Sequence, residues 1–257
     1  MIDQKTIDIL WTYVDKYNQV DFIENDPISI PYRYKNPRDI EIAAFFTAII
    51  SWGQRKTIIK NANALMEIFD DRPFEFVKHA STAELNMASK FVHRTFNGED
   101  LLFLIERLRI LLADSPNLES LFFAENTSPQ NDPNAVQHGL ERFYSLIFAE
   151  NATHRTKKHV STPTKKSACK KLNMFLRWMV RNDGIVDFGI WQNIHPSKLK
   201  IPLDTHVIRI SNMLEITPSL KSNWLDCELL TAQLAEIHPD DPVIFDYALF
   251  GMGVDLK

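Results

Sequence analysis

The chain has 257 residues, 45% of them hydrophobic and 24% charged, which is enough apolar material to bury a core without disulfides or metal ions. Its net charge of −4 excludes a protein that is basic throughout, and its two cysteines, Cys169 and Cys227, cannot supply a four-cysteine zinc site or an iron–sulfur cluster with four thiolates. The N-terminus has no basic segment followed by an apolar run, and no stretch is apolar enough to span a bilayer, so we expect a cytoplasmic protein.

Apolar residues recur at helical spacing from the beginning of the chain. In residues 3–19 they form one stripe, which predicts an amphipathic helix. Asn36-Pro37 marks a second helix start, because asparagine caps well and proline is tolerated at the first helical position. The helix that follows is apolar on most faces from Ile40 to Trp52, so we expect it at the centre of the core.

The rest of the chain also predicts helices joined by short loops. With seven glycines and no convincing pair of strands, the sequence predicts an all-α protein. The further expected segments are helices over 57–69, 99–113, 133–149, 167–181, 204–214, 224–237 and 241–251, a polar loop over 126–134, a basic linker over 151–164 and a single helical turn over 186–191.

Positive charge is concentrated between residues 155 and 181 of this acidic chain. An enzyme that acts on nucleic acid needs only one basic face, so the segment is a candidate nucleic-acid contact; a solvated lysine loop explains it equally well. The basic residues are Arg155, Lys157, Lys158, Lys165, Lys166, Lys170, Lys171, Arg177 and Arg181.

Asp204 stands just before an apolar helix, where an aspartate ordinarily serves as a helix cap worth about 1 kcal/mol. The same position suits catalysis, because backbone N–H groups and the helix dipole keep such a carboxylate ionised. An ionised carboxylate there can stabilise the positive charge that develops on a sugar as its glycosidic bond breaks.

Lys170 and Lys171 lie near the start of another predicted helix. A lysine becomes nucleophilic when burial, a neighbouring cation or the positive end of a helix lowers its pKa. Lys170 meets the last two conditions, so its neutral amine can attack a sugar anomeric carbon and form a Schiff base. A solvated lysine pair is the simpler alternative.

The segment IPLDTHVIRISNML resembles the one that carries the catalytic aspartate in the helix-hairpin-helix DNA glycosylase superfamily. In that superfamily a hairpin of the type Pro-Gly-(Val/Ile)-Gly-x-Lys precedes a helix, and here KKSACKKLNMFLRWM takes its place. The superfamily places apolar residues two, five and six positions after the lysine. Counting from Lys170 gives Leu172, Phe175 and Leu176, whereas counting from Lys171 gives Asn173, Leu176 and Arg177, so the register favours Lys170.

Two further segments are similar to motifs of the superfamily. Residues 49–54, IISWGQ, resemble the LLSAQ-type motif, with one extra residue before Gln54. The glutamine of that motif fills the gap left by a flipped base, which implies the same role for Gln54. The segment FDYALFGMG resembles the terminal helix of archaeal 8-oxoguanine glycosylases, in which an aspartate and an aromatic residue four positions later help hold the oxidised base. Asp246 and Phe250 match that spacing, with phenylalanine where tryptophan is expected. The overall pattern is closest to a bacterial family related to those enzymes.

Two departures from the superfamily pattern concern the lysine and its hairpin. No glycine lies between Asn151 and Arg181, so the backbone grip on DNA phosphate that glycines permit must be built in another way or is missing. The spacing from Lys170 to Asp204 is wider than in most members, as it also is in the archaeal branch.

The resemblance implies one glycosylase-like helical domain over 1–257, with a lobe of residues 37–150, a second of 1–36 plus 151–257, and a cleft between them. It implies a monomeric, nucleoid-associated DNA-repair glycosylase with lyase activity that removes an oxidised purine, chiefly 8-oxoguanine, from double-stranded DNA. A nucleic-acid-binding module that does not cut, or a protein that binds a nucleoside or another small ligand, remains open. We expect no metal or other cofactor. The expected catalytic residues are Lys170 and Asp204, and the expected base or DNA contacts are Gln54, Trp52, Asp246, Phe250, Lys166, Lys171, Arg177 and His206.

Overall fold

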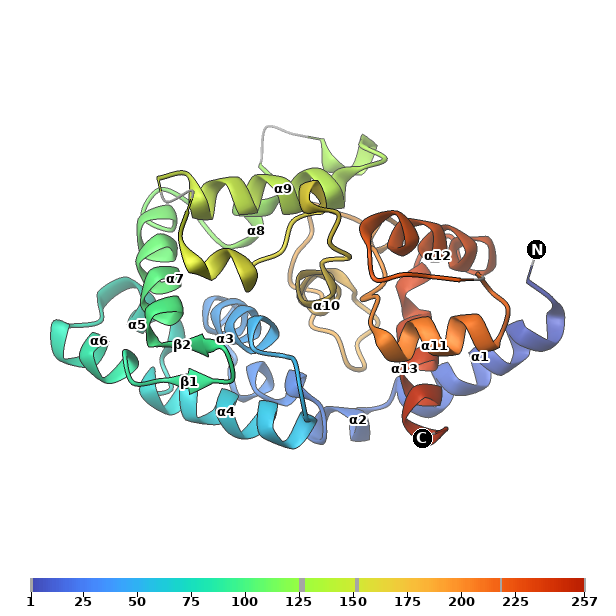
Figure 1. Ribbon diagram of the computed structural model, residues 1–257, viewed down its shortest axis with the longest axis horizontal. Coiled ribbons are helices and arrows are strands. Elements are labelled where there is room, and N and C mark those ends of the chain that lie inside the picture. The colour runs from blue at the N-terminus through green and yellow to red at the C-terminus, as the bar shows by residue number, and fades with distance from the viewer. Residues whose placement is uncertain (1, 125–127, 151–152, 218, 257) are drawn as a thin grey trace. The chain divides into compact units, whose positions relative to one another are not determined.

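The computed structural model describes residues 2–124, 128–150, 153–217 and 219–256, and these residues are predominantly helical (Figure 1). The all-α prediction is therefore confirmed at the level of fold class. One detail was wrong: β1 (Val92–His93) and β2 (Phe96–Asn97) pair antiparallel as a short hairpin. Strands of two residues are too short to leave an alternating pattern in the sequence.

The chain divides into two compact units. Unit 1 contains residues 1–24, 128–137 and 162–257, and unit 2 contains residues 25–127 and 138–161. Three segments fall outside the predicted lobes: 25–36 and 151–161 lie in unit 2, and 128–137 lies in unit 1. The short 3-10 helices of the first two segments pack on α3 and α7 of unit 2.

Unit 2 is built around the apolar helix α3. Asn36 caps this helix by accepting a hydrogen bond from the Arg38 backbone N–H at 3.0 Å, as predicted, and residues 40–49 are all buried. The elements of this part of the chain are η1 (Pro27–Ser29), η2 (Pro31–Arg33), α3 (Pro37–Ile49), α4 (Arg55–Ile68), α5 (Pro73–His79), α6 (Thr82–Ala88), α7 (Gly98–Leu111), α8 (Glu119–Phe122), α9 (Ala135–Phe148), which begins in unit 1, and η4 (Arg155–Lys158).

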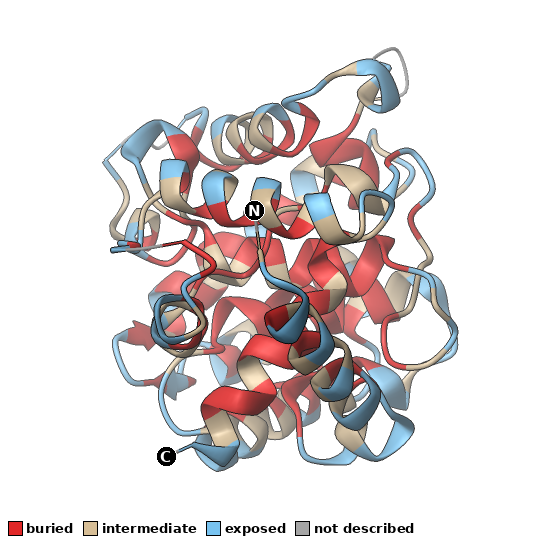
Figure 2. Ribbon diagram, turned by 90° about the vertical axis from the view of Figure 1, so that its right-hand side faces the viewer, coloured by how far each residue is buried: buried red, intermediate tan, exposed pale blue. Residues whose placement is uncertain are grey.

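In unit 1, helix α13 packs on both α1 and α11. Gly251 of α13 permits the close approach of α1, since a Cβ atom there would lie 2.2 Å from the Tyr17 ring. Figure 2 shows buried and exposed residues alternating along individual helices, as amphipathic packing requires. The elements are α1 (Gln4–Tyr17), α2 (Val20–Glu24), η3 (Pro129–Asn131), η5 (Pro163–Lys165), α10 (Lys170–Val180), η6 (Pro196–Lys198), α11 (Thr205–Met213), α12 (Trp224–Ile237), η7 (Pro242–Ile244) and α13 (Phe245–Asp255).

Three predicted segments of unit 1 differ in the structure. Helix α10 begins at Lys170 rather than Ser167, because Cys169 has a left-handed backbone with φ of 50°. Residues 186–191 form no helical turn, since the Phe188 N–H instead donates to the Trp178 carbonyl. The final helix is preceded by η7, so its regular α-helical part starts at Phe245.

The Gly251→Ala substitution should lower the free energy of unfolding by about 1–3 kcal/mol, because the added methyl group overlaps the Tyr17 ring. Chemical denaturation of the two proteins measures this difference. In a Tyr17→Ala background the cost of Gly251→Ala should be much smaller, since the overlapping ring is gone. Equal costs in both backgrounds would show that the helix contact is not the cause.

Candidate active site

Lys170 and Asp204 meet in unit 1. Lys170 is the first residue of α10 and Asp204 caps α11, and the lysine Nζ lies 3.4 Å from Asp204 Oδ2. The Lys170 side chain is 35% exposed and that of Asp204 15%. Two residues 34 positions apart in the sequence thus form a partly open ion pair, in which an amine and a carboxylate are both accessible to a ligand.

The two oxygens of Asp204 have different partners. Oδ1 accepts hydrogen bonds from the backbone N–H groups of His206 at 2.8 Å and Val207 at 2.9 Å, so it performs the predicted capping of α11. Oδ2 faces Lys170. Because the backbone fixes one oxygen, the other is held in a defined direction and can stabilise positive charge beside it.

The loop before Lys170 adopts left-handed backbone at two residues other than glycine. Lys166 has φ of 60° and Cys169 φ of 50°. Counting back from Lys170, Lys166 falls on the first glycine of the glycosylase hairpin motif. Its carbonyl accepts a hydrogen bond from the Trp224 N–H at 3.2 Å, and Ser167 forms a β-bridge with Asn223. Tertiary contacts therefore support a turn conformation that glycine ordinarily supplies.

The basic segment is only partly a charged surface. Lys166 is exposed, whereas Lys171 is half-buried, and burial, followed by the charge of Lys170, lowers the pKa of Lys171 to about 7. Arg155 pairs with the buried Asp100 inside unit 2. Some of the positive charge counted in the sequence is therefore neutralised within the fold rather than presented to a partner.

Arg177 was predicted as a DNA contact, and the structure contradicts a direct contact because its side chain is buried. Its guanidinium forms ion pairs with Asp187, at 3.3 Å from Nε to Oδ1, and with Asp246. It also lies over the Tyr247 ring, 4.4 Å from the centroid. Arg177 therefore acts within unit 1, on the carboxylates around it.

Asp246 lies on α13 and is buried in contact with Arg177. Burial raises the pKa of Asp246 to about 6; the charge of Arg177 opposes this shift and the charge of Asp204 adds to it. Asp246 therefore lies within electrostatic range of the Lys170–Asp204 pair.

Phe250 and His206 lie on neighbouring helices of unit 1 and are half-buried. The Phe250 ring packs edge-to-face on the ring of Phe22, with 6.2 Å between centroids. His206 packs against Gly253 of α13, where a Cβ atom would lie 2.9 Å from that of the histidine.

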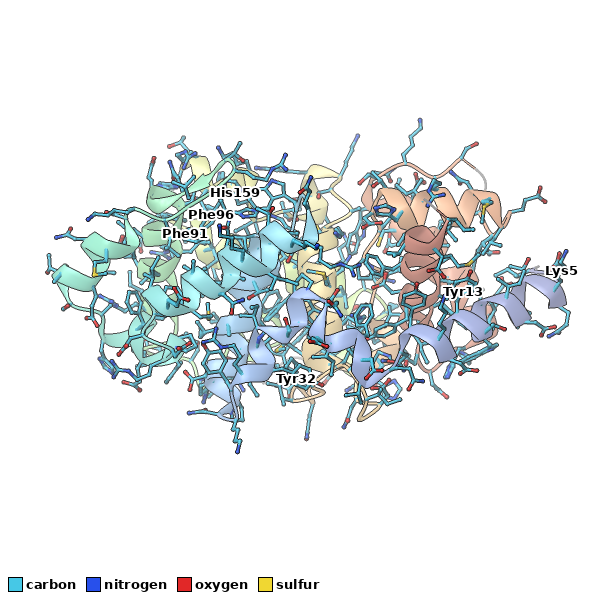
Figure 3. The ribbon with its side chains drawn as sticks, turned by 90° about the horizontal axis from the view of Figure 1, so that it is seen from below. Lys5, Tyr13, Tyr32, Phe91, Phe96 and His159 are labelled. Carbon is cyan, nitrogen blue, oxygen red and sulfur yellow. The ribbon has the colours of Figure 1, made fainter. Side chains whose placement is uncertain are left out.

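Trp52 and Gln54 belong to unit 2. Gln54 is exposed and precedes α4 without capping it by a side-chain hydrogen bond. Trp52 is half-buried and packs edge-to-face on His93, with centroids 4.8 Å apart, and stacks on His159 at 5.4 Å. Figure 3 labels His159 beside Phe96, which contacts it edge-to-face. Two buried histidines therefore fix the orientation of the Trp52 indole.

Several residues of the site were missed by sequence reasoning. Asp187 accepts a hydrogen bond from Tyr247 Oη at 2.9 Å and pairs with Arg181 as well as Arg177. A signal was present in the sequence, because Arg177 lies within the apolar part of α10 and Arg181 follows directly after its last residue, Val180. Two arginines in so apolar a segment require carboxylate partners when they are buried.

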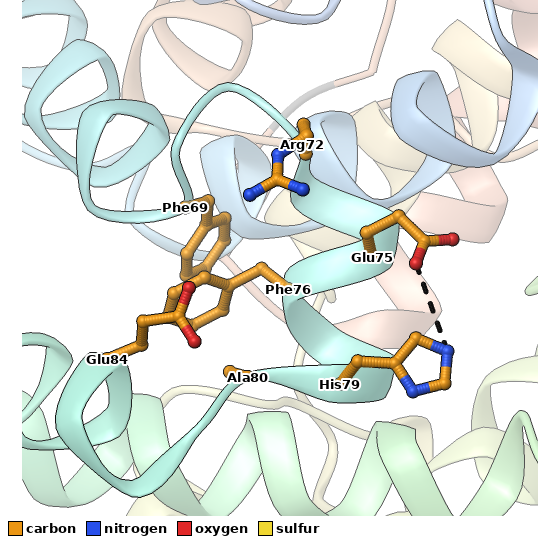
Figure 4. A pocket seen from close by; sticks show the side chains of 7 residues that line it. All are labelled: Phe69, Arg72, Glu75, Phe76, His79, Ala80 and Glu84. Carbon is orange, nitrogen blue, oxygen red and sulfur yellow. Dashed lines mark ion pairs between the residues drawn. The ribbon is translucent and has the colours of Figure 1, made fainter.

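A separate pocket of unit 2 contains none of the predicted site residues. It is lined by Phe69, Arg72, Glu75, Phe76, His79, Ala80 and Glu84, and His79 pairs with Glu75 at 3.8 Å (Figure 4). Within the described residues, no three histidine, cysteine, aspartate or glutamate side chains are grouped to hold a metal ion. None of the described helices is both long and apolar enough to cross a membrane.

The chain belongs to the family described as "Protein of unknown function (DUF2400)", whose model matches residues 26–255. The match includes Lys170, Asp204 and Asp246. No curated protein and no solved structure matches the chain significantly.

Lys166→Gly should change the free energy of unfolding by less than about 0.5 kcal/mol. Glycine removes the steric cost that a side chain pays in the left-handed conformation, and this gain offsets the greater conformational entropy of glycine in the unfolded state. Lys166→Val should lower it by about 1–2 kcal/mol, because a β-branched residue fits this conformation poorly. Denaturant titration measures both. Lys165→Val is the control at the neighbouring residue, which has no positive φ. An equal loss of stability in the two valine variants would show that the left-handed backbone of Lys166 is not the cause.

Lys171→Met should raise the stability of the protein at pH 7. With a pKa of about 7 when folded and 10.5 when unfolded, Lys171 binds more protons in the unfolded state between these values. The group therefore destabilises the fold at neutral pH, and the penalty disappears as the pH rises to 10.5. Denaturation at several pH values should show the advantage of Lys171→Met shrinking over this window; an advantage that grows with pH would contradict it.

Proposed function

We propose that this protein is a DNA glycosylase with abasic-site lyase activity, in which Lys170 and Asp204 carry the chemistry. The observation that carries the proposal is the 3.4 Å contact between Lys170 Nζ and Asp204 Oδ2 at the starts of two helices. An amine beside a carboxylate, both partly exposed, suits attack on a sugar whose transition state is positively charged.

Lys170 attacks C1′ of the flipped nucleotide, and the resulting adduct opens to a Schiff base. Asp204 Oδ2 stabilises the positive charge on the sugar while the glycosidic bond breaks. Lys171 is the rival nucleophile, because its pKa of about 7 leaves much of its amine neutral at physiological pH. Lys170 is preferred because it is the lysine that pairs with Asp204.

The substrate we propose is an oxidised purine, chiefly 8-oxoguanine, extruded from duplex DNA. Phe250 offers an aromatic face on the same helix as Asp246, which suits contact with a flipped base. Gln54 is exposed and can occupy the gap in the duplex, and Trp52 offers a fixed indole. Stacking of this kind is worth about 1–3 kcal/mol per base.

The remaining predicted contacts are electrostatic. Lys166 is exposed on the turn before α10, where its ammonium suits a DNA phosphate. Lys171 and His206 are less exposed and lie beside Lys170 and Asp204 in the sequence. We propose that the protein acts as a monomer on nucleoid DNA and needs no cofactor.

Borohydride trapping on duplexes that contain 8-oxoguanine or an abasic site tests this function. The protein should form a covalent adduct that is lost in Lys170→Ala and retained in Lys171→Ala. Asp204→Asn should cut base release by about a hundredfold while preserving the fold, because asparagine caps helices about as well as aspartate. Lys221→Ala, at an exposed lysine elsewhere in unit 1, is the matched control and should trap normally.

Each contrary outcome has a definite meaning. Loss of trapping in Lys171→Ala but not in Lys170→Ala would identify Lys171 as the nucleophile. DNA binding without adduct or base release across a panel of lesions would favour a nucleic-acid-binding module that does not cut. Absence of salt-dependent DNA binding would remove both proposals.

A further inference from the structure

In unit 2, the β1–β2 hairpin is held against the loop that precedes α4. His93 Nε2 donates a hydrogen bond to the Trp52 carbonyl at 3.2 Å, and His93 Nδ1 accepts one from Asn61 Nδ2 on α4 at 2.8 Å. Arg94 follows His93 and lies against Gly53, where a Cβ atom would be 2.7 Å from Arg94 Nη1. Two segments distant in the sequence thus form one continuous surface of unit 2.

Arg94 occupies a turn position that favours glycine. The register pairs His93 with Phe96, which leaves Arg94 and Thr95 as the two-residue turn of the hairpin. Such turns take a positive φ at the first central residue, usually from glycine or asparagine. Arg94 has φ of 55°, which is less favourable for a residue with a long side chain. The guanidinium is therefore placed at this turn at some cost in stability.

The positive charge of this surface has no internal partner. Arg94 is exposed, as are Lys56 and Lys60, which lie one turn apart on α4. Residues 54–66 and 85–98 contain no aspartate or glutamate, although the chain as a whole is acidic. Within the part of the chain that the structure describes, no carboxylate pairs with any of the three cations. In contrast, Arg72 beyond the other end of α4 pairs with Asp70 at 2.7 Å.

The groups beside these cations suit a nucleic acid. Gln54 is exposed between Gly53 and α4, and its side chain makes no capping hydrogen bond. The indole of Trp52 is half-buried and packs on His93. Cations that can bind phosphates, next to an amide and a ring that can contact bases, are typical of nucleic-acid surfaces. An acidic protein or an anionic membrane would use the cations alone.

We propose that the turn of the β1–β2 hairpin and the exposed face of α4 form a DNA contact in unit 2, in which Arg94, Lys56 and Lys60 bind backbone phosphates beside Gln54. The inference takes its partner, duplex DNA, from the proposed function, but it does not depend on the chemistry of Lys170. Because every nucleotide carries the same phosphate, this contact holds damaged and undamaged duplexes alike.

The salt dependence of binding to a short undamaged duplex tests the inference. Each phosphate contact adds about 0.9 to the slope of log Kd against log salt concentration. Arg94→Asn should lower the slope by about 1 and weaken binding roughly five- to tenfold at 0.1 M salt. Changing Lys56 and Lys60 together to glutamine should lower the slope by about 2, whereas Arg94→Lys should keep most of the wild-type slope.

Two comparisons separate loss of the contact from loss of the fold. Asparagine suits the left-handed turn better than arginine does, so Arg94→Asn should unfold at the same or a higher denaturant concentration than the wild type. Arg72→Gln is the matched control, because it removes an exposed arginine of the same unit whose charge is already paired. It should keep the wild-type slope and affinity.

The outcomes distinguish this inference from the function on which it rests. An unchanged slope in both Arg94→Asn and the double lysine variant, in a protein that traps normally, would overturn the inference alone. So would a loss confined to the damaged duplex, or a loss of binding to phosphatidylserine vesicles with DNA binding intact. The expected slopes in a protein that traps on no lesion would overturn the glycosylase proposal and leave the inference standing. A wild-type protein without salt-dependent DNA binding would remove both.

Discussion

The burial of two guanidinium groups at the C-terminal end of α10, those of Arg177 and Arg181, constrains the arrangement of unit 1. Arg177 is 4% exposed and Arg181 1%, and an unpaired buried charge costs several kcal/mol. Their carboxylate partners come from α13, from the turn before η7 and from the segment after α10. These ion pairs tie α10 to its neighbours along its C-terminal half, and the position of Lys170 at its other end follows from that attachment.

The two aspartates of this region are held in different ways. Capping of α11 occupies one oxygen of Asp204 and leaves the other facing Lys170, whereas Asp246 is buried and paired with Arg177. Capping and ion pairing are ordinary stabilising interactions. Here capping also orients the carboxylate of Asp204, and ion pairing orients that of Asp246. The stability of unit 1 and the proposed function of Asp204 therefore depend on the same hydrogen bonds.

Unit 2 places charge and aromatic rings together in a similar way. Asp100 is buried and accepts a hydrogen bond at 3.0 Å from the backbone N–H of Asn97, the residue that caps α7. Asp100 also pairs with Arg155 and contacts His159 at 3.4 Å. His159 in turn stacks on Trp52. The segment expected to be a basic linker is thus part of the packing of this unit, because its arginine and histidine find a buried carboxylate distant in sequence.

The sequence by itself determined most of the helices, the caps at Asn36 and Asp204, and the residue types at the candidate site. Asn36 and Asp204 cap the helices predicted from them, because capping depends on neighbours within a few residues. Only tertiary structure decided that Lys166 adopts a left-handed backbone without glycine and that Arg177 is buried rather than exposed. It also decided the contact between Lys170 and Asp204, since their distance depends on how α10 and α11 pack and not on local sequence.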